Sequence, residues 1–248
     1  KKRCYLAEEA PICQGRLRGD FGYLSVSPIA KAILHGSYVY PADFDEDTKA
    51  ICRECARIRS LIPIDSVSFE INEDVWSREW RRLKEDTSSS ESGLHFGHYR
   101  ASLQYRILAQ FHALKTSLVL KHGIVLERWS RGLSVMLEKL FGFTLISKLR
   151  SILLMEADFN FANKQIYGVR MLGQARKYKL MPEEIFSERN RMADDGTLAK
   201  TLFYDLARQT RRPAGLASVD AESCYDRVAH AIASLVFQAF GVPDNAVV

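Results

Sequence analysis

Hydrophobic residues recur every three or four positions along most of this chain, which is the spacing of one face of an α-helix. This pattern predicts helices over residues 28–34 and 48–58, around Trp76 and Trp80, and over 99–121, 123–140, 158–177, 196–208 and 227–240. Shorter apolar runs predict extended segments at 67–71, 147–156 and 216–219. The pattern as a whole therefore predicts a helix-rich α+β fold.

Polar segments separate these predicted elements. Residues 45–48 read Asp-Glu-Asp-Thr and are expected to form the N-terminal cap of the second helix, because short polar side chains accept hydrogen bonds from the first turn. Residues 88–93 read Ser-Ser-Ser-Glu-Ser-Gly and offer no apolar face to bury. We therefore expect the main boundary of the chain at this segment, with a mostly helical N-terminal extension over residues 1–87.

The composition is that of an ordinary globular protein with a mild positive charge. The 248 residues are 47% hydrophobic and 26% charged, a balance that excludes disordered, collagen-like and coiled-coil chains. The longest apolar stretch, residues 114–126, is interrupted by Lys115, Lys121 and His122, so no membrane span is expected. The chain opens with neither an initiator Met nor an apolar leader, so we expect a piece of a longer protein.

The net charge of +5 is compatible with a polyanionic partner without requiring one. Each cluster of basic residues, taken by itself, is most simply interpreted as the solvent-exposed face of a helix. The clusters are Arg78, Arg81, Arg82 and Lys84; Lys148 and Arg150; Lys164, Arg170, Arg176, Lys177 and Lys179; and Arg189 and Arg191.

Five cysteines, an odd number, argue against a disulfide framework and for a reducing compartment, either the nucleus or the cytoplasm. Cys52 and Cys55 have the spacing of half a zinc site. The other candidate ligands, Cys4, Cys13 and His35, form no second close pair. The helical pattern of residues 48–58 therefore favours two cysteines buried on one helix face.

The histidines and tryptophans have structural interpretations. His95 and His98 lie in a glycine-containing turn and are too few for a metal site, which favours turn packing. Trp76, Trp80 and Trp129 fit helical core faces better than base-stacking platforms.

The most informative segment is the apolar run 216–219, which ends at Asp220 and is followed by the predicted helix 227–240. A carboxylate that follows a buried strand lies at the edge of a sheet, where ligand sites are common. From spacing alone, Asp220 has three uses: binding a divalent metal, capping the following helix, or pairing with an arginine.

This segment resembles the first palm motif of reverse transcriptases. That motif has an apolar strand, an Asp, three residues, a small residue, an aromatic and a second Asp, then an apolar helix with an early His. Asp220, the Cys-Tyr-Asp run at 224–226 and His230 match it without a gap. The resemblance implies that Asp220 binds the catalytic Mg²⁺ or Mn²⁺. It also implies that Tyr225 excludes a ribose 2′-hydroxyl, with Asp226 holding the turn.

Residues 149–164 are similar to the fingers motif of non-LTR reverse transcriptases, with Ser151 in place of the usual Pro and Asn160 in place of a frequent Lys. The resemblance implies that Arg150 and Lys164 neutralise the triphosphate or position the template backbone. Lys148 and Arg170 are further candidates for this role.

Two more segments resemble the same family in the expected order. Residues 182–191 are similar to a template-contacting loop, in which Asn190 replaces a Gly and the usual Gln is missing; this makes Arg191 a template-binding candidate. Residues 92–100 resemble the entry of reverse-transcriptase reading frames in retroelements of algae and fungi. Four ordered matches are a far more specific signal than one.

Asp194 and Asp195 resemble the paired-Asp signature of the family's other catalytic motif. They precede Asp220, however, whereas the family places that signature well after it. They also stand at the start of the predicted helix 196–208, where acidic residues stabilise the first turn. We therefore interpret both as helix-capping residues.

Together these matches imply the fingers and the beginning of the palm of an RNA-directed DNA polymerase from a non-LTR-like retroelement. Its substrates would be an RNA template, a DNA primer and deoxynucleoside triphosphates, joined by two-metal nucleotidyl transfer. Residues 1–87 would be the N-terminal extension, 88–215 a fingers-like region and 216–248 the start of the palm. The chain stops before the paired-Asp motif, so we expect it to be inactive by itself. The alternative is a non-catalytic nucleic-acid-binding or scaffolding module descended from a polymerase.

Overall fold

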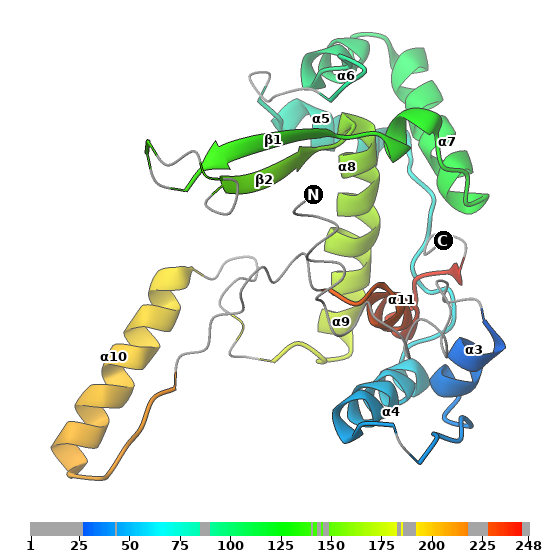
Figure 1. Ribbon diagram of the computed structural model, residues 1–248. Helices are drawn as coiled ribbons and strands as arrows, with labels where there is room; N and C mark the ends of the chain where they lie inside the picture. The colour runs from blue at the N-terminus through cyan, green and yellow to red at the C-terminus, as the bar shows by residue number, and fades with distance from the viewer. Residues whose placement is uncertain are drawn as a thin grey trace.

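The computed structural model of the protein describes residues 27–42, 44–84, 90–139, 141–142, 145, 149–182, 185, 192–217 and 228–244. Its elements are α3 (Pro28–Leu34), α4 (Glu46–Leu61), α5 (Glu73–Arg82), α6 (Phe96–Ser102), α7 (Arg106–Lys121), η1 (Glu127–Ser130), β1 (Leu133–Glu138), β2 (Leu149–Leu154), α8 (Ala157–Asn163), η3 (Lys164–Met171), α9 (Leu172–Lys177), α10 (Ala193–Thr210) and α11 (His230–Ala239) (Figure 1). Within these residues the fold is helix-rich with one two-stranded sheet, which confirms the general α+β prediction. No helix in this part of the chain is long and apolar enough to cross a membrane.

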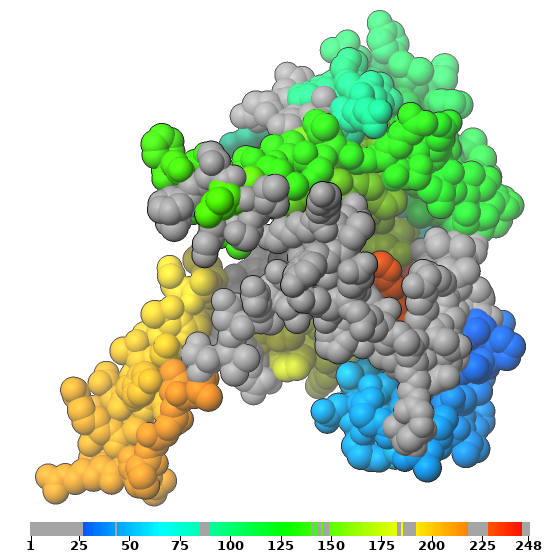
Figure 2. All heavy atoms as spheres, in the orientation of Figure 1, coloured from blue at the N-terminus to red at the C-terminus, as the bar shows by residue number. Residues whose placement is uncertain are grey.

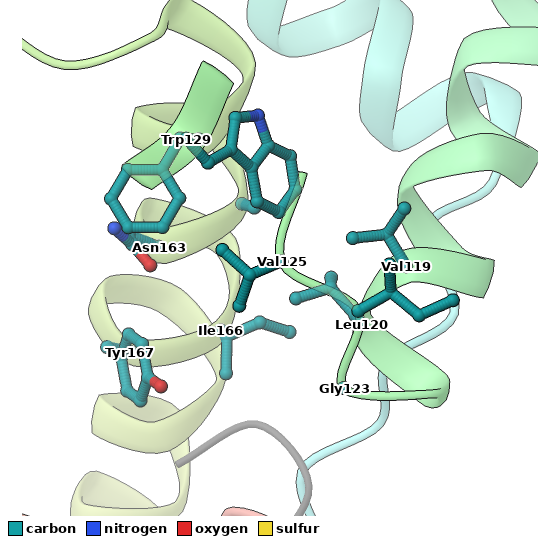
Figure 3. Close-up of a pocket in the computed structure, with 11 residues that line it drawn as sticks. Val119, Leu120, Gly123, Val125, Trp129, Asn163, Ile166 and Tyr167 are labelled. Atoms are coloured by element: carbon teal, nitrogen blue, oxygen red, sulfur yellow. The ribbon is translucent and has the colours of Figure 1, made fainter. Parts of the chain in front are cut away.

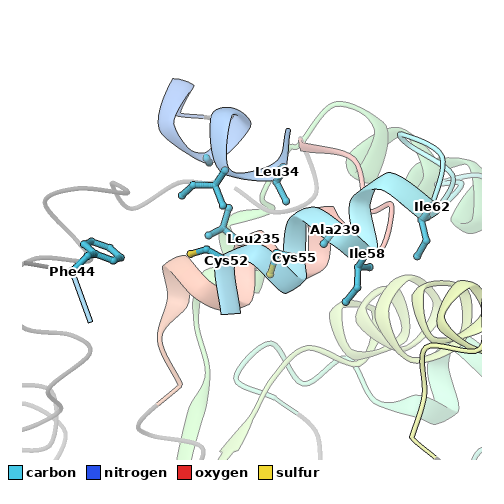
Figure 4. Close-up of a cluster of buried hydrophobic side chains, with 10 residues drawn as sticks. Leu34, Phe44, Cys52, Cys55, Ile58, Ile62, Leu235 and Ala239 are labelled. Atoms are coloured by element: carbon cyan, nitrogen blue, oxygen red, sulfur yellow. The ribbon is translucent and has the colours of Figure 1, made fainter. Parts of the chain in front are cut away.

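One hydrophobic core joins the beginning and the end of the described chain. The Asp45 side chain accepts a hydrogen bond from the Thr48 amide and begins α4, so the cap lies within the predicted segment 45–48. α11 packs against both α3 and α4. The buried residues of this core are Ala30, Ile33, Leu34, Phe44, Cys52, Cys55, Ile58, Ile62, Leu235 and Ala239 (Figure 4). The predicted units 1–87 and 216–248 therefore share a core.

Cys52 and Cys55 are free and buried on α4, as the helical pattern predicted. Burial raises the pKa of Cys52 to about 11 and that of Cys55 to about 12, so both thiols are protonated at neutral pH. Metals bind the thiolate rather than the thiol. Across the described residues, no group of three or more His, Cys, Asp or Glu side chains is placed to hold a metal ion. Cys4 and Cys13 lie outside these residues.

A second core lies between α5, α6, α7 and α8 and is built on aromatic rings. Trp76 and Trp80 are fully buried, and Trp80 stacks on Tyr99 with ring centroids 4.5 Å apart. Trp76 meets Phe161 of α8 edge-on at 4.8 Å. Trp129 of η1 is buried in a neighbouring cluster. The core role predicted for the three tryptophans is confirmed.

The turn before α6 uses two histidines as caps. The His95 Nδ1 atom accepts a hydrogen bond from the Gly97 amide, and the His98 Nδ1 atom accepts one from the His95 amide. Each ring therefore satisfies a backbone donor at the helix start that has no partner within the helix. The structural role predicted for both residues is confirmed.

The predicted helix over residues 123–140 is wrong, because the described part of this segment forms the short 3₁₀-helix η1 followed by the strand β1. β1 pairs antiparallel with β2, with Leu133 opposite Leu154 and Val135 opposite Ile152. A Cβ atom on Gly132 would lie 2.8 Å from the Leu153 Cδ1 atom and from the Met155 Sδ atom, so a larger residue here would have to displace these two side chains. The apolar residues that suggested a helix face are instead shared between the two faces of a hairpin.

The predicted strand at residues 67–71 is also wrong, although the segment is hydrogen-bonded. The Val67 amide donates to the Gly241 carbonyl after α11, at 3.0 Å. The Ile71 amide donates to the Ser117 Oγ atom of α7, at 2.7 Å. The segment lies between helices and satisfies its backbone groups with turns and side chains rather than with a neighbouring strand.

The predicted helix 158–177 is confirmed as the continuous rod α8–η3–α9, whose middle part, η3, is wound as a π-helix. The predicted helix 196–208 is confirmed as α10, and 227–240 corresponds to α11. At the predicted strand 216–219, Leu216 and Ala217 are exposed and irregular, so the expected burial is wrong for these two residues. Residues 218 and 219 lie outside the described part of the chain.

Candidate nucleic-acid interface

Five of the residues singled out by the resemblance lie outside the described residues. They are Lys148, Arg191, Asp220, Tyr225 and Asp226. Their roles in metal, nucleotide and template binding therefore stay predictions. Arg150, Lys164 and Arg170 are described, and they have three different environments.

Arg150 is exposed on β2, directly opposite Leu137 of β1. The hairpin presents it near the end that carries the β1–β2 connection. A guanidinium group in this position is accessible to a phosphate from solvent.

Lys164 and Arg170 are held by contacts within the chain. The Lys164 Nζ atom forms an ion pair with Glu79 of α5. The Arg170 guanidinium donates hydrogen bonds to the backbone carbonyls of Ser68 and Glu70, the latter at 2.6 Å. Both basic residues therefore face the 68–79 stretch of the chain, whereas Arg150 extends on the hairpin.

A buried ion network lies where β2 turns into α8. Arg128 donates from its Nη1 atom to Glu156 at 2.8 Å and to Asp158 at 2.7 Å, and from its Nη2 atom to the second oxygen of Asp158. The Trp129 Nε1 atom donates to Asp158 at 2.9 Å, and the Lys115 Nζ atom lies 3.5 Å from the same carboxylate. The Asp158 side chain is 0% exposed.

Two serines complete this network from a distant part of the sequence. The Ser90 and Ser92 hydroxyls each donate a hydrogen bond to an oxygen of Glu156. Ser90 itself is buried. The expectation that residues 88–93 have nothing to bury is therefore wrong at Ser90, because a buried carboxylate supplies its polar partner.

Both carboxyl groups of the network are ionised near neutral pH. Burial alone would raise the pKa of Asp158, but the hydrogen bonds and charge of Arg128 outweigh burial and hold this pKa below its ordinary value. For Glu156, burial is likewise outweighed by the hydrogen bonds from Ser90, Ser92 and Arg128, which lower its pKa. Two acids and two bases, Arg128 and Lys115, leave the network neutral overall.

Sequence analysis assigned no role to Arg128, Glu156 or Asp158. A signal for the two acids exists, because Glu156 and Asp158 interrupt an otherwise apolar stretch with charges two residues apart. Buried charges require partners, but nothing in the sequence indicates that Arg128 is the partner. The two carboxylates of the network are buried. The network joins η1, α7 and the corner between β2, which carries Arg150, and the rod α8–η3–α9.

The basic end of α5 borders an open hollow beside α6. This hollow has a volume of about 430 Å³ and is lined by Arg81, Arg100, Ala101, Leu103 and Gln104. Both arginines are exposed, and neither belongs to an ion pair among the described residues. Two guanidinium groups and an amide are donors that suit phosphate oxygens. The hollow therefore has the hydrogen-bond donors that an anion site requires.

A second cavity, between α7, η1 and the rod, is apolar and small. Its volume is about 80 Å³, and its walls include Val119, Leu120, Trp129, Ile166 and Tyr167 (Figure 3). Pockets for drug-sized ligands start at roughly 300 Å³. The cavity is therefore too small for a nucleotide.

Comparison of this chain with protein-family models, with curated proteins and with solved structures finds no match.

Proposed function

We propose that this chain is the fingers and the beginning of the palm of an RNA-directed DNA polymerase, a nucleotidyltransferase of a non-LTR-like retroelement. The order of four family-like motifs along the sequence carries the proposal. One of them, residues 149–164, folds as a strand, a buried corner and a helix. This arrangement holds Arg150 on an exposed strand whose direction is fixed by the network around Arg128.

Nucleic acid is the proposed partner, as an RNA template paired with a DNA primer. The supporting geometry is the hollow lined by Arg81 and Arg100, together with the exposed Arg150. Phosphate contacts of this kind position a nucleic acid without reading its sequence. Lys164 is a weaker candidate than Arg150, because a phosphate would have to displace Glu79 from it.

Asp220 is the proposed metal-binding residue and Tyr225 the proposed sugar gate. A carboxylate oxygen is a ligand that Mg²⁺ accepts, so Asp220 fits the role by its chemistry. A bound divalent cation would stabilise the charge that develops on phosphate oxygens during transfer. The described residues add no further ligand to this assignment.

Nucleic-acid binding tests the proposal. Fluorescence anisotropy of a labelled RNA–DNA hybrid should show binding that weakens with salt, because each neutralised phosphate releases counterions. Arg81→Glu combined with Arg100→Glu should reduce both the affinity and the salt dependence. Arg57→Glu is the matched control, because Arg57 is an exposed arginine of α4 on a different surface. Equal loss of affinity in the control and in the double variant would contradict an interface at the hollow.

A further inference from the structure

The two proposed nucleic-acid contacts lie on segments that meet at one buried carboxylate. Arg100 of the hollow belongs to α6, and Arg150 belongs to β2. The Ser90 and Ser92 hydroxyls donate to different oxygens of Glu156, the second of them at 2.9 Å. The two serines lie just before α6, and Glu156 lies just after β2. This carboxylate therefore joins the segment that enters α6 to the segment that leaves the hairpin of β1 and β2.

The serines belong to a turn that leads directly into α6. The Gly93 amide donates to the Ser90 carbonyl at 3.1 Å, and Gly93 has a φ of 71°, a conformation that favours glycine. The Leu94 amide donates to the Ser92 Oγ atom at 3.2 Å. His95 then caps α6. Because these hydrogen bonds follow one another along the chain, the positions of the two hydroxyls are tied to that of α6.

The aromatic core fixes α6 on the body of the protein, whereas the hairpin is mostly exposed. Trp80 packs against Tyr99 of α6 and against Phe161 of α8, with ring centroids 4.5 and 5.6 Å apart. The hairpin projects sideways from this body (Figures 1 and 2), and most of its residues are exposed. Met155 and Glu156, which join β2 to α8, are irregular. The direction of the hairpin relative to α6 therefore depends on side-chain contacts at this joint, and Glu156 makes the contacts that reach the α6 side.

A small movement at this joint is expected to displace Arg150, because Arg150 lies far along the hairpin. Arg150 is opposite Leu137, whereas Leu154, at the joint end of β2, is opposite Leu133. At about 3.3 Å per residue, Arg150 lies about 13 Å from Leu154. A rotation of about 10° at the joint would move Arg150 by about 2 Å. Such a displacement is enough to break a hydrogen bond to a phosphate oxygen.

We propose that Glu156 is a positioning residue of the nucleic-acid interface. Held by Ser90 and Ser92, its carboxylate sets the spacing between the hollow and Arg150. The inference rests on the proposed function, because this spacing matters only if the hollow and Arg150 contact one nucleic acid. A duplex is stiff and repeats its phosphates at regular intervals. A fixed spacing lets the second contact form without the entropic cost of ordering the hairpin.

The distance between two spin labels tests the positioning role without nucleic acid. Met136 of β1 and Tyr105, which follows α6, are 51% and 66% exposed, so ketone amino acids that carry nitroxide labels can replace them. Double electron–electron resonance should give a narrow distance distribution in the otherwise wild-type chain. Ser90→Ala combined with Ser92→Ala removes the link to Glu156 and should broaden this distribution.

Two further variants separate loss of the link from general destabilisation. Ser130→Ala removes an exposed serine hydroxyl of η1 that donates to the Glu127 carbonyl, and it should keep the narrow distribution. Ser92→Thr retains a hydroxyl at an exposed position and should restore the distribution that Ser92→Ala broadens. Far-UV circular dichroism should show the same helix content in all variants. Equal broadening in Ser130→Ala, or an unchanged distribution in the serine double variant, would overturn the positioning role.

Binding of an RNA–DNA hybrid in two backgrounds tests the consequence for the interface. The serine double variant should lower the affinity by roughly threefold to tenfold when Arg150 is present. In an Arg150→Ala background it should cause no further loss. A merely destabilised protein would lose affinity to the same extent in both backgrounds, and this outcome would overturn the inference. A wild type that binds no hybrid would contradict the proposed function together with this inference, whereas normal binding with an unchanged spin-label distribution would overturn the positioning role alone.

Discussion

Asp158 lies in a segment that resembles a family motif, but its contacts in the structure are those of a buried structural residue. It belongs to the segment that resembles a nucleotide-binding motif, yet its carboxylate is fully buried between Arg128, Trp129 and Lys115. Removal of one partner from a buried ion pair is costly, because the remaining charge has lost its solvent and its counterion. The network is therefore a strong determinant of the corner geometry.

Arg128→Met should destabilise the protein by about 3–5 kcal/mol, because it leaves Glu156 and Asp158 as neighbouring buried acids. Chemical denaturation monitored by tryptophan fluorescence measures this difference. Arg57→Met is the control, because the exposed pair between Arg57 and Glu54 is worth about 0–1 kcal/mol. Equal stability losses in the two variants would show that the network contributes little.

The network should also make stability depend on pH in the acid range. The pKa values of Glu156 and Asp158 in the folded protein lie below their ordinary values of 4.5 and 3.8. Their contribution is therefore complete above about pH 5 and is lost as the pH falls through the lowered values. Denaturation midpoints measured from pH 6 downward should fall less steeply in Asp158→Asn than in the wild type. Parallel pH curves for the two proteins would contradict this assignment.

At the scale of elements, local sequence patterns were sufficient where an element is amphipathic and capped. Asp45 with α4, the tryptophans of α5 and the acidic first turn of α10 all follow from such patterns. The patterns failed at residues 123–140 and 67–71. Pairing with β2 decides the first of these segments, and contacts with Ser117, Arg170 and Gly241 decide the second. Neither set of partners is adjacent in sequence, so no local pattern reveals it.

Substitution of Arg170 and of Arg150 should separate an effect on stability from an effect on nucleic-acid binding. Arg170→Ala removes two hydrogen bonds to backbone carbonyls of the 67–71 segment, and we expect a loss of about 1–3 kcal/mol in stability with little change in affinity for an RNA–DNA hybrid. Arg150→Ala should do the reverse, because its side chain is exposed on the hairpin. Denaturation and anisotropy on the same two variants measure both effects. Loss of affinity in Arg170→Ala together with loss of stability in Arg150→Ala would contradict this assignment.

At the scale of the whole molecule, the sequence predicted the candidate site only in part. It identified exposed Arg150 and the basic run that ends α5, but not that Arg81 and Arg100 share one hollow. That juxtaposition depends on the packing of α5 against α6 around Trp80 and Tyr99. The sequence patterns assigned residues 1–87 and 216–248 to separate parts of the chain. They gave no indication that α11 packs on α3 and α4. Both arrangements depend on contacts between residues that are far apart in the sequence, so they become visible only in the folded structure.

The 248-residue chain should bind a primed template without extending it. Two-metal catalysis requires several carboxylates around a pair of ions, and the family resemblance assigns only Asp220 to them. Asp194 and Asp195 lie in the first turn of α10. Primer extension with labelled deoxynucleotides should therefore give no product. Extension that Asp220→Asn abolishes would show that a second carboxylate is supplied elsewhere in the chain.

Cross-linking of the chain to a photoreactive RNA–DNA hybrid, followed by peptide mass spectrometry, tests the proposed function most directly. The proposal places the hybrid along the hollow of α5 and α6 and the β1–β2 hairpin. Cross-links should therefore concentrate in residues 78–104 and 133–164 and disappear with an excess of unlabelled hybrid. Cross-links confined to α3, α4 and α11, or cross-links that competitor does not remove, would contradict it.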